Sequence, residues 1–182
     1  MRKEQKANYP ESARGAAALL VRMVLEDGAY TNIALNQYLR GSRLSDLDRR
    51  LATELVYGTV KASGTLDWYL AQCVSRPLDK VAGDILAILR ISTYQLLYMT
   101  RIPASAAVNE AVKLARSVSH EGSAKFVNGV LRGLLRKQEA GAFVLPDAEK
   151  QDADYLSLKY YHPRWLVKRW LGPWGRGGTE RL

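Results

Sequence analysis

The sequence predicts an all-α protein, a helical bundle of about seven helices with a short helical C-terminal extension. Three observations lead to this fold class. Apolar residues recur at helical spacing along most of the chain, and no segment alternates with the two-residue period of a strand. The turns between the periodic segments are three to seven residues long, as in bundles whose successive helices lie side by side.

The first predicted helix covers residues 13–27, where Ala16, Leu20 and Val24 share one face. Gly28 follows as a helix stop. Thr31 is expected to cap the next helix, residues 32–40, which ends at a glycine.

Ser45 resembles the start of a capping box and opens a helix over residues 46–63. Gly64 separates it from a further helix over residues 66–74. Residues 80–99 are the richest in Ile and Leu, so this helix is expected to be central and buried on most sides.

Pro103 ends the central helix, and Ser105 is expected to cap the following one, residues 106–118. The last bundle helix covers 123–137, with Ser123 at its cap. Its apolar stripe consists of Val127, Val130, Leu131, Leu134 and Leu135. The opposite side carries Lys125, Gly129, Arg132 and Arg136, with Phe126 and Gly133 on the border.

The predicted domain organisation has three parts. Residues 1–140 form the bundle, residues 141–152 a linker, and residues 153–182 the incomplete beginning of a following region. Pro163 should divide that last part into two short helices. Thr179 could cap another helix, for which only three residues remain, and we therefore expect a further domain to be missing.

Charge favours a polyanionic partner, since 27 Lys and Arg face 18 Asp and Glu, a net +9. Nucleic acid is the first candidate. The alternative is a basic surface that only keeps the protein dissolved. Cys73 is the single cysteine, which suits a reducing compartment, and no apolar run indicates a signal peptide or a membrane partner. The expected location is cytoplasmic.

Four motifs carry a family resemblance. They are an Ile-Leu-Arg helix ending in Tyr-x-Leu-Leu-Tyr, an Ile-Pro break, an Asn-Glu-Ala-Val helix and the segment Lys-Phe-Val-Asn-Gly-Val-Leu, all within residues 85–136. Together they resemble the RNA-binding NusB fold family. Residues 64–72 and 160–175 are similar to elements of one branch, the N-terminal domain of the bacterial 16S rRNA cytosine-C5 methyltransferases known as Sun, Fmu or RsmB.

This resemblance implies a domain that recognises structured small-subunit ribosomal RNA for an S-adenosylmethionine-dependent methyltransferase. The catalytic cysteines and cofactor site of that family would lie on the missing domain. We therefore expect no catalytic residue, no cofactor and no metal in this chain, and as partners ribosomal RNA and the methyltransferase domain in cis.

Two alternatives remain at this stage. A stand-alone NusB-type transcription antitermination factor would bind RNA together with a protein partner and take part in the regulation of transcription. A helical scaffold would bind protein only.

The candidate RNA-binding residues cluster around the start of the last bundle helix. A helix N-terminus attracts phosphate, and Phe126 could stack an unpaired base. Packing in the core is the competing interpretation for Phe126, and plain solvation for Lys125. The full predicted set is Arg14, Lys113, Arg116, Ser123, Lys125, Phe126, Arg132 and Arg136. Arg14 is included because the start of helix one lies beside the RNA surface in the NusB family.

Trp165, Trp170 and Trp174 alternate with basic residues in the C-terminal extension, a composition typical of single-stranded RNA binding. The competing interpretation is that these tryptophans pack against the missing domain or cover the bundle. Cys73 is expected to be a small buried hydrophobe. His120 and His162 are isolated and lack metal-ligand spacing.

Overall fold

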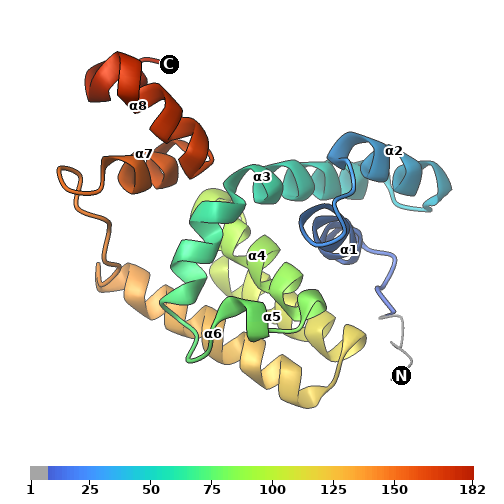
Figure 1. Ribbon diagram of the computed structural model, residues 1–182. Helices are drawn as coiled ribbons and strands as arrows, with labels where there is room; N and C mark the ends of the chain where they lie inside the picture. Colours follow the sequence, from blue (N-terminus) through green and yellow to red (C-terminus); the bar gives the residue numbers. More distant parts are fainter. Residues whose placement is uncertain (1–7) are drawn as a thin grey trace, which may run out of the picture.

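The computed structural model describes residues 8–182. Within this range the chain is helical with no strand, which confirms the all-α prediction. The elements are α1 (Ala13–Leu25), α2 (Thr31–Gly41), α3 (Asp46–Ala71), the 3-10 turn η1 (Leu78–Lys80), α4 (Gly83–Tyr98), α5 (Ala104–Val118), α6 (Glu121–Glu139), α7 (Asp152–Tyr160) and α8 (Arg164–Thr179). Figure 1 shows α1–α6 as a bundle and α7 and α8 standing apart from it.

Helix α4 is the centre of the bundle, as its composition predicts. It packs against α1, α3, α5 and α6. Six of its residues between 85 and 91 are buried apolar side chains, so the helix is apolar on nearly every side. The polar Gln95 is also buried, and its amide is satisfied by the Ile91 carbonyl and by Arg14 from α1. The core is therefore assembled around one helix.

Helix α3 differs from the prediction because it continues through Gly64 to Ala71 instead of breaking there. The bundle thus has six α-helices in the described part of the chain, one fewer than expected. Thr65 and Leu66 are buried against the core, and this burial offsets the roughly 1 kcal/mol cost of an interior glycine. Figure 1 shows that α3 bends along its length.

The predicted caps are correct at α3 and wrong at three other helices. Ser45 accepts a hydrogen bond from the Asp48 amide at 3.2 Å. Tyr30, Pro103 and His120 hold the cap positions of α2, α5 and α6, in place of Thr31, Ser105 and Ser123. At α6 the His120 ring accepts from the Ser123 amide, so a histidine takes the role usually given to a hydroxyl or carboxylate.

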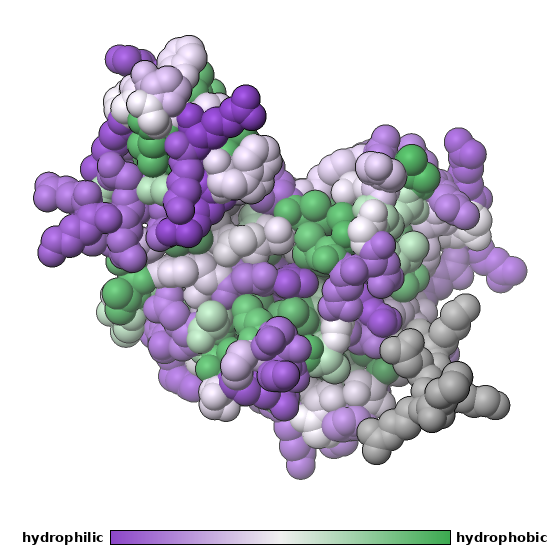
Figure 2. Space-filling model, in the orientation of Figure 1, coloured by the Kyte–Doolittle hydropathy of each residue, from purple (hydrophilic) through white to green (hydrophobic). Residues whose placement is uncertain are grey.

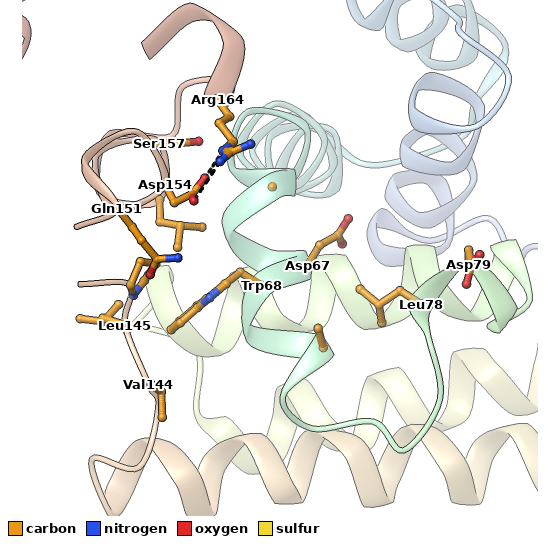
Figure 3. A pocket seen from close by; sticks show the side chains of 14 residues that line it. Asp67, Trp68, Leu78, Asp79, Val144, Leu145, Gln151, Asp154, Ser157 and Arg164 are labelled. Atoms are coloured by element: carbon orange, nitrogen blue, oxygen red, sulfur yellow. Dashed lines mark hydrogen bonds and ion pairs between the residues drawn. The ribbon is translucent and has the colours of Figure 1, made fainter. Parts of the chain in front are cut away.

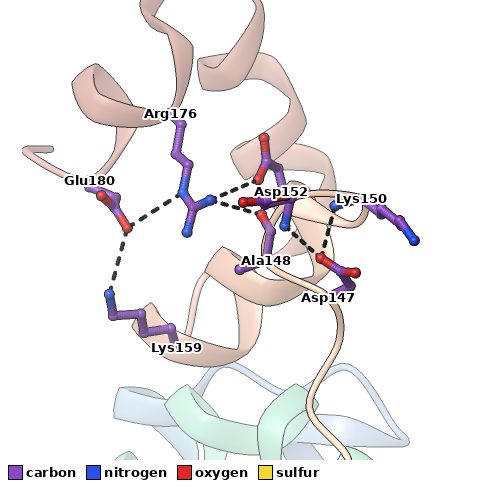
Figure 4. Close-up of polar contacts among 8 residues, drawn as sticks. Asp147, Ala148, Lys150, Asp152, Lys159, Arg176 and Glu180 are labelled. Carbon is purple, nitrogen blue, oxygen red and sulfur yellow. Dashed lines mark hydrogen bonds and ion pairs between the residues drawn. The ribbon is translucent and has the colours of Figure 1, made fainter.

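The C-terminal extension folds as a helical hairpin. Tyr161, in the left-handed conformation, and Pro163 separate α7 from α8, as the proline predicts. The hairpin is held by a hydrogen bond and ion pairs. Arg176 donates to the Ala148 carbonyl at 2.9 Å and lies 3.5 Å from Asp152, while Glu180 bridges Arg176 and Lys159 (Figure 4). Helix α8 continues past Pro173 with a kink at Gly175, so Thr179 ends this helix instead of capping another.

Contacts from α3 and α4 tie the hairpin to the bundle. Thr65 of α3 donates to the Leu158 carbonyl at 3.0 Å, and the Tyr98 and Tyr161 rings meet edge to face with centroids 5.6 Å apart. The space-filling view shows the hairpin as a lobe with an indentation between it and the bundle (Figure 2). The assignment of residues 153–182 to a following domain stays a prediction.

The ion pair between Asp67 of α3 and Arg90 of α4 is bidentate, with both bonds 2.8 Å long, and the Arg90 side chain is only 11% exposed. We expect Asp67→Ala to lower the free energy of unfolding by about 2–3 kcal/mol, because it leaves a buried guanidinium without its partner. Urea unfolding followed by circular dichroism measures this.

The double variant Asp67→Ala/Arg90→Met should recover much of that loss, since it removes the stranded charge. Glu54→Ala is the matched control, because Glu54 pairs with an exposed Arg101 and should cost less than about 1 kcal/mol. Equal losses in the control and in Asp67→Ala would contradict the argument.

Because of two half-buried tyrosines, Tyr9 and Tyr98, we expect the free energy of unfolding to fall at alkaline pH. Burial and the bonds to Asp84 and Tyr161 raise the pKa of Tyr9 and of Tyr98, respectively. The unfolded chain therefore releases these protons more readily above about pH 10, which favours unfolding as pH rises.

We expect the melting temperature to drop between pH 8 and about pH 11, and to drop less in Tyr9→Phe. The exposed Tyr30→Phe serves as control because it alters no buried hydroxyl. An unchanged pH dependence in Tyr9→Phe would show that Tyr9 is not responsible.

Candidate nucleic-acid interface

Helix α6 has the amphipathic character that the sequence predicts. Val127, Leu131 and Leu134 are fully buried in the core, whereas Lys125, Arg132 and Arg136 are exposed. Helices α5 and α6 pack extensively on one another. The apolar stripe of α6 thus fixes the helix on the bundle and turns its basic side to solvent.

A hollow of about 310 Å³ lies at the N-terminal end of α6, and we name it the α6 hollow. It is enclosed by α6, the end of α5, η1 and the start of α4. Its lining is Arg76, Lys80, Val81, Ala82, Ile85, Ser119, His120, Gly122, Ser123 and Phe126. The hollow combines cationic, hydroxyl and aromatic groups, the types that bind phosphate and bases.

Phe126 is half-buried, packing on the core while also lining the hollow. The Arg76 guanidinium lies over its ring, 4.6 Å from the centroid. One part of the Phe126 ring therefore packs in the core and another part is accessible to a base, so both interpretations from the sequence apply. Its accessible part is presented together with a cation, so a base that stacks there meets a positive charge.

Ser123 is the third residue of α6 and is already hydrogen-bonded. Its amide donates to His120 Nδ1 at 3.2 Å, and its hydroxyl lies 2.9 Å from the Ser119 hydroxyl. The first turn also contains Glu121, and the hydrogen bond from Arg116 lowers the pKa of that carboxyl. This helix N-terminus is less open to an anion than predicted.

The remaining predicted cations divide into paired and open groups. Arg116 is bonded to Glu121 at 2.6 Å, and Lys113 to Glu110 at 3.1 Å. Arg132 donates to Asn128 at 3.0 Å. Lys125 and Arg136 form no ion pair or side-chain hydrogen bond with residues 8–182 and are the most available of the set.

Arg14 lies away from this group. Its guanidinium bonds the buried Gln95 at 2.8 Å, near the C-terminal end of α4. The α6 hollow is lined by Ile85 near the other end of α4, about 15 Å away along the helix axis. RNA contact by Arg14 stays a prediction, but the structure gives Arg14 a structural role between α1 and α4.

Arg76 and Lys80 were missed by the sequence analysis. They lie between α3 and α4, where no helical period relates them to α6. Only their basic character marks them, and many basic residues share it. Tertiary packing brings them to the hollow.

Gly129 and Gly133 of α6 are not required by packing against a neighbouring helix. A Cβ added at Gly129 would meet nothing within 4 Å, and one at Gly133 only the Arg136 side chain at 3.8 Å. By contrast, a Cβ at Gly58 in α3 would strike the Tyr94 ring of α4. The α6 glycines therefore face open space on the same side as Lys125 and Arg136.

The structure also places Cys73 and the His, Cys, Asp and Glu side chains that could bind a metal ion. Burial raises the pKa of the half-buried Cys73 thiol, which suits the predicted role as a small hydrophobe. Between residues 8 and 182 no group of three or more His, Cys, Asp or Glu side chains is arranged to hold a metal ion. Nor does any helix in that range combine the length and apolar character needed to cross a bilayer.

The fold and the hollow define a class of protein, an all-α bundle with basic and aromatic side chains at the start of α6, the last helix of the bundle. Residues 11–136, more than two thirds of the chain, match the NusB family. The chain belongs to the NusB family.

The likeness to one curated relative extends beyond the bundle. The chain is 40% identical over 171 residues to a probable ribosomal RNA small subunit methyltransferase B of Synechocystis. The match takes in 94% of this chain and only 37% of that relative, so the chain spans a little over a third of the relative's length. It therefore includes part of the α7–α8 hairpin.

Two solved structures show the same fold. Antitermination factor NusB, in a crystal structure with NusE and double-stranded RNA, is 21% identical with a TM-score of 0.63 over 70% of this chain and 96% of its own. The crystal structure of PH0851 is 19% identical with a TM-score of 0.68, over 97% of this chain and 38% of its own. The hairpin is thus shared with the longer protein.

Gly129→Ala should raise the free energy of unfolding by about 0.5–1 kcal/mol, because alanine is the better helix former and its methyl meets open space. Chemical denaturation measures it. Gly58→Ala should instead destabilise, since its methyl would collide with Tyr94. A loss of stability in Gly129→Ala would show that the glycine has a packing role.

Proposed function

We propose that this chain is the RNA-binding domain of an S-adenosylmethionine-dependent ribosomal RNA cytosine-C5 methyltransferase, and that it grips structured small-subunit rRNA for the catalytic part. The observation that carries the proposal is the α6 hollow. Phe126 lies there beside Arg76 and Lys80, and it directly follows the exposed Lys125 in α6.

The chemistry of the hollow supports an RNA ligand more than a protein one. Phosphates contribute most of the affinity in such complexes through contacts with Lys and Arg, and unpaired bases stack on aromatic or guanidinium planes. A half-buried ring under a guanidinium provides both kinds of contact within one hollow. The net charge of +9 favours the same class of partner.

The methyltransferase setting is favoured over a stand-alone antitermination factor by the α7–α8 hairpin. The relative from Synechocystis and PH0851 match nearly the whole chain, whereas the likeness to NusB stops at 70% of it. In this proposal S-adenosylmethionine and the catalytic cysteines belong to the part of the protein that this chain does not span, and that part is the partner in cis.

The experiment measures the affinity of the chain for a labelled 16S rRNA hairpin by fluorescence anisotropy at several salt concentrations. Lys125→Ala should weaken binding and reduce the slope of log affinity against log salt by about one, the loss of one phosphate contact. Phe126→Leu keeps an apolar side chain in the core and should weaken binding with little change in slope.

Arg40→Ala is the matched control, because Arg40 is an exposed cation on α2, which does not contribute to the hollow. Its affinity and slope should equal those of the parent. Unchanged binding in Lys125→Ala together with Arg132→Ala would refute this placement of the site. Salt-independent or absent binding by the parent would favour a protein scaffold instead.

A further inference from the structure

We infer that the junction between the bundle and the α7–α8 hairpin is a second RNA site, which takes unpaired nucleotides that flank the structured RNA. This rests on the proposed function and extends it. The site, named the junction groove, consists of two hollows of about 390 and 270 Å³ that share Thr65 and Tyr161. Together they reach the size of a small-ligand site.

Aromatic rings dominate one end of the groove. Five line the smaller hollow, Trp68 and Tyr69 from α3, Tyr98 from α4, and Tyr155 and Tyr161 from the hairpin. They gather where the hairpin packs against α3. Flat rings at the wall of an open hollow are the platform on which bases of single-stranded RNA stack, largely irrespective of sequence.

Cationic side chains line both hollows. Lys61 and Arg164 line the larger one together with His162, and Lys159 lines the smaller one, whereas no Asp or Glu lines either, as far as the described chain goes. Lys159 and Arg164 are partly neutralised by Glu180 and Asp154. Lys61 is exposed and forms no ion pair within residues 8–182, so it is the principal phosphate contact.

Acidic side chains lie beyond one end of the junction groove. A third hollow, of about 820 Å³, adjoins the groove. It shares Gly64 with the larger hollow of the groove and Trp68 with the smaller one. Asp67, Asp79 and Asp154 line this hollow, and Figure 3 shows Trp68 extending from α3 toward Leu145 at its edge. Asp67 and Asp154 are paired with Arg90 and Arg164, whereas Asp79 forms no ion pair within residues 8–182 and repels phosphate, so this hollow is the less favourable path for an RNA strand beyond Trp68.

Two backbone features suit a ligand at this position. Gly64 lies within α3, where glycine is unfavourable, and a Cβ there would meet nothing within 4 Å, so packing does not require it. It lines the larger hollow, and its lack of a side chain lets a sugar-phosphate backbone approach α3.

Tyr161 ends α7 with φ at 59°, and it is the only residue other than glycine with a positive φ in the described chain. Glycine or asparagine usually holds such a position. A tyrosine here accepts backbone strain and places its ring between the two hollows. These observations together point to single-stranded RNA.

The test compares two labelled probes, a 16S rRNA hairpin with blunt ends and the same hairpin with a single-stranded uridine flank. Tyr161→Asn removes the ring and suits the left-handed backbone, so the α7–α8 segment of the protein should still fold. Gly64→Leu keeps every ring, improves helix propensity and fills the groove. Each should weaken binding of the flanked probe about tenfold, toward that of the blunt probe.

Neither variant should alter binding of the blunt probe. Tyr30→Asn is the matched control, an exposed tyrosine ahead of α2 that should leave both affinities unchanged. With 4-thiouridine in the flank, ultraviolet crosslinking should label the peptide that contains Tyr161.

Flanked-probe affinities equal to those of the parent in both variants, with Lys125→Ala still weakening binding, would overturn the junction groove and leave the proposed function standing. A parent that binds neither probe would overturn both. Changes in self-association, without any change in RNA affinity, would show that the groove holds a second protein chain and would also overturn the inference.

Discussion

Burial of α4 on nearly every side is the constraint on which the rest of the structure depends. Its Ile and Leu side chains are covered by α1, α3, α5 and α6, and each such side chain contributes about 1.5–3 kcal/mol when fully buried. Covering one helix with four neighbours fixes where each neighbour lies. It also fixes which face each neighbour turns outward, and so sets the position of the basic side of α6 and of the groove beside α3.

The positive potential of the surface depends mainly on the cations that have no carboxylate partner. Arg116 and Lys113 are held by neighbouring carboxylates, and Arg14 by a buried amide, so these cations serve the fold at least as much as any ligand. Exposed pairs of this kind contribute little stability, and each reduces the positive potential that a polyanion meets. The cations around Phe126 and Lys61 therefore matter more for RNA than the total of +9 indicates.

Two helical glycines lower helix stability without a packing reason, and both lie at surfaces where we propose that RNA binds. Gly58 is required by the Tyr94 ring, whereas Gly64 and Gly129 meet open space beside the two proposed RNA surfaces. A residue that lowers helix stability without a packing reason is expected where a partner approaches the backbone. The strained Tyr161 is a second case of the same kind, since it also lies at a proposed site.

From the sequence alone follow the all-α class, the central place of residues 80–99 and the two-faced character of α6, because hydrophobic periodicity is a local property. The break expected at Gly64 was wrong, since burial of Thr65 and Leu66 outweighs a local helix-breaking preference. Three of the predicted caps were also wrong, because α2, α5 and α6 begin one to three residues earlier than expected. Only tertiary structure decided that Arg76 lies over Phe126, that Arg14 bonds Gln95 and that Tyr161 packs against Tyr98 of α4. These pairs are far apart in the chain, and no periodic pattern relates residues that meet only through packing.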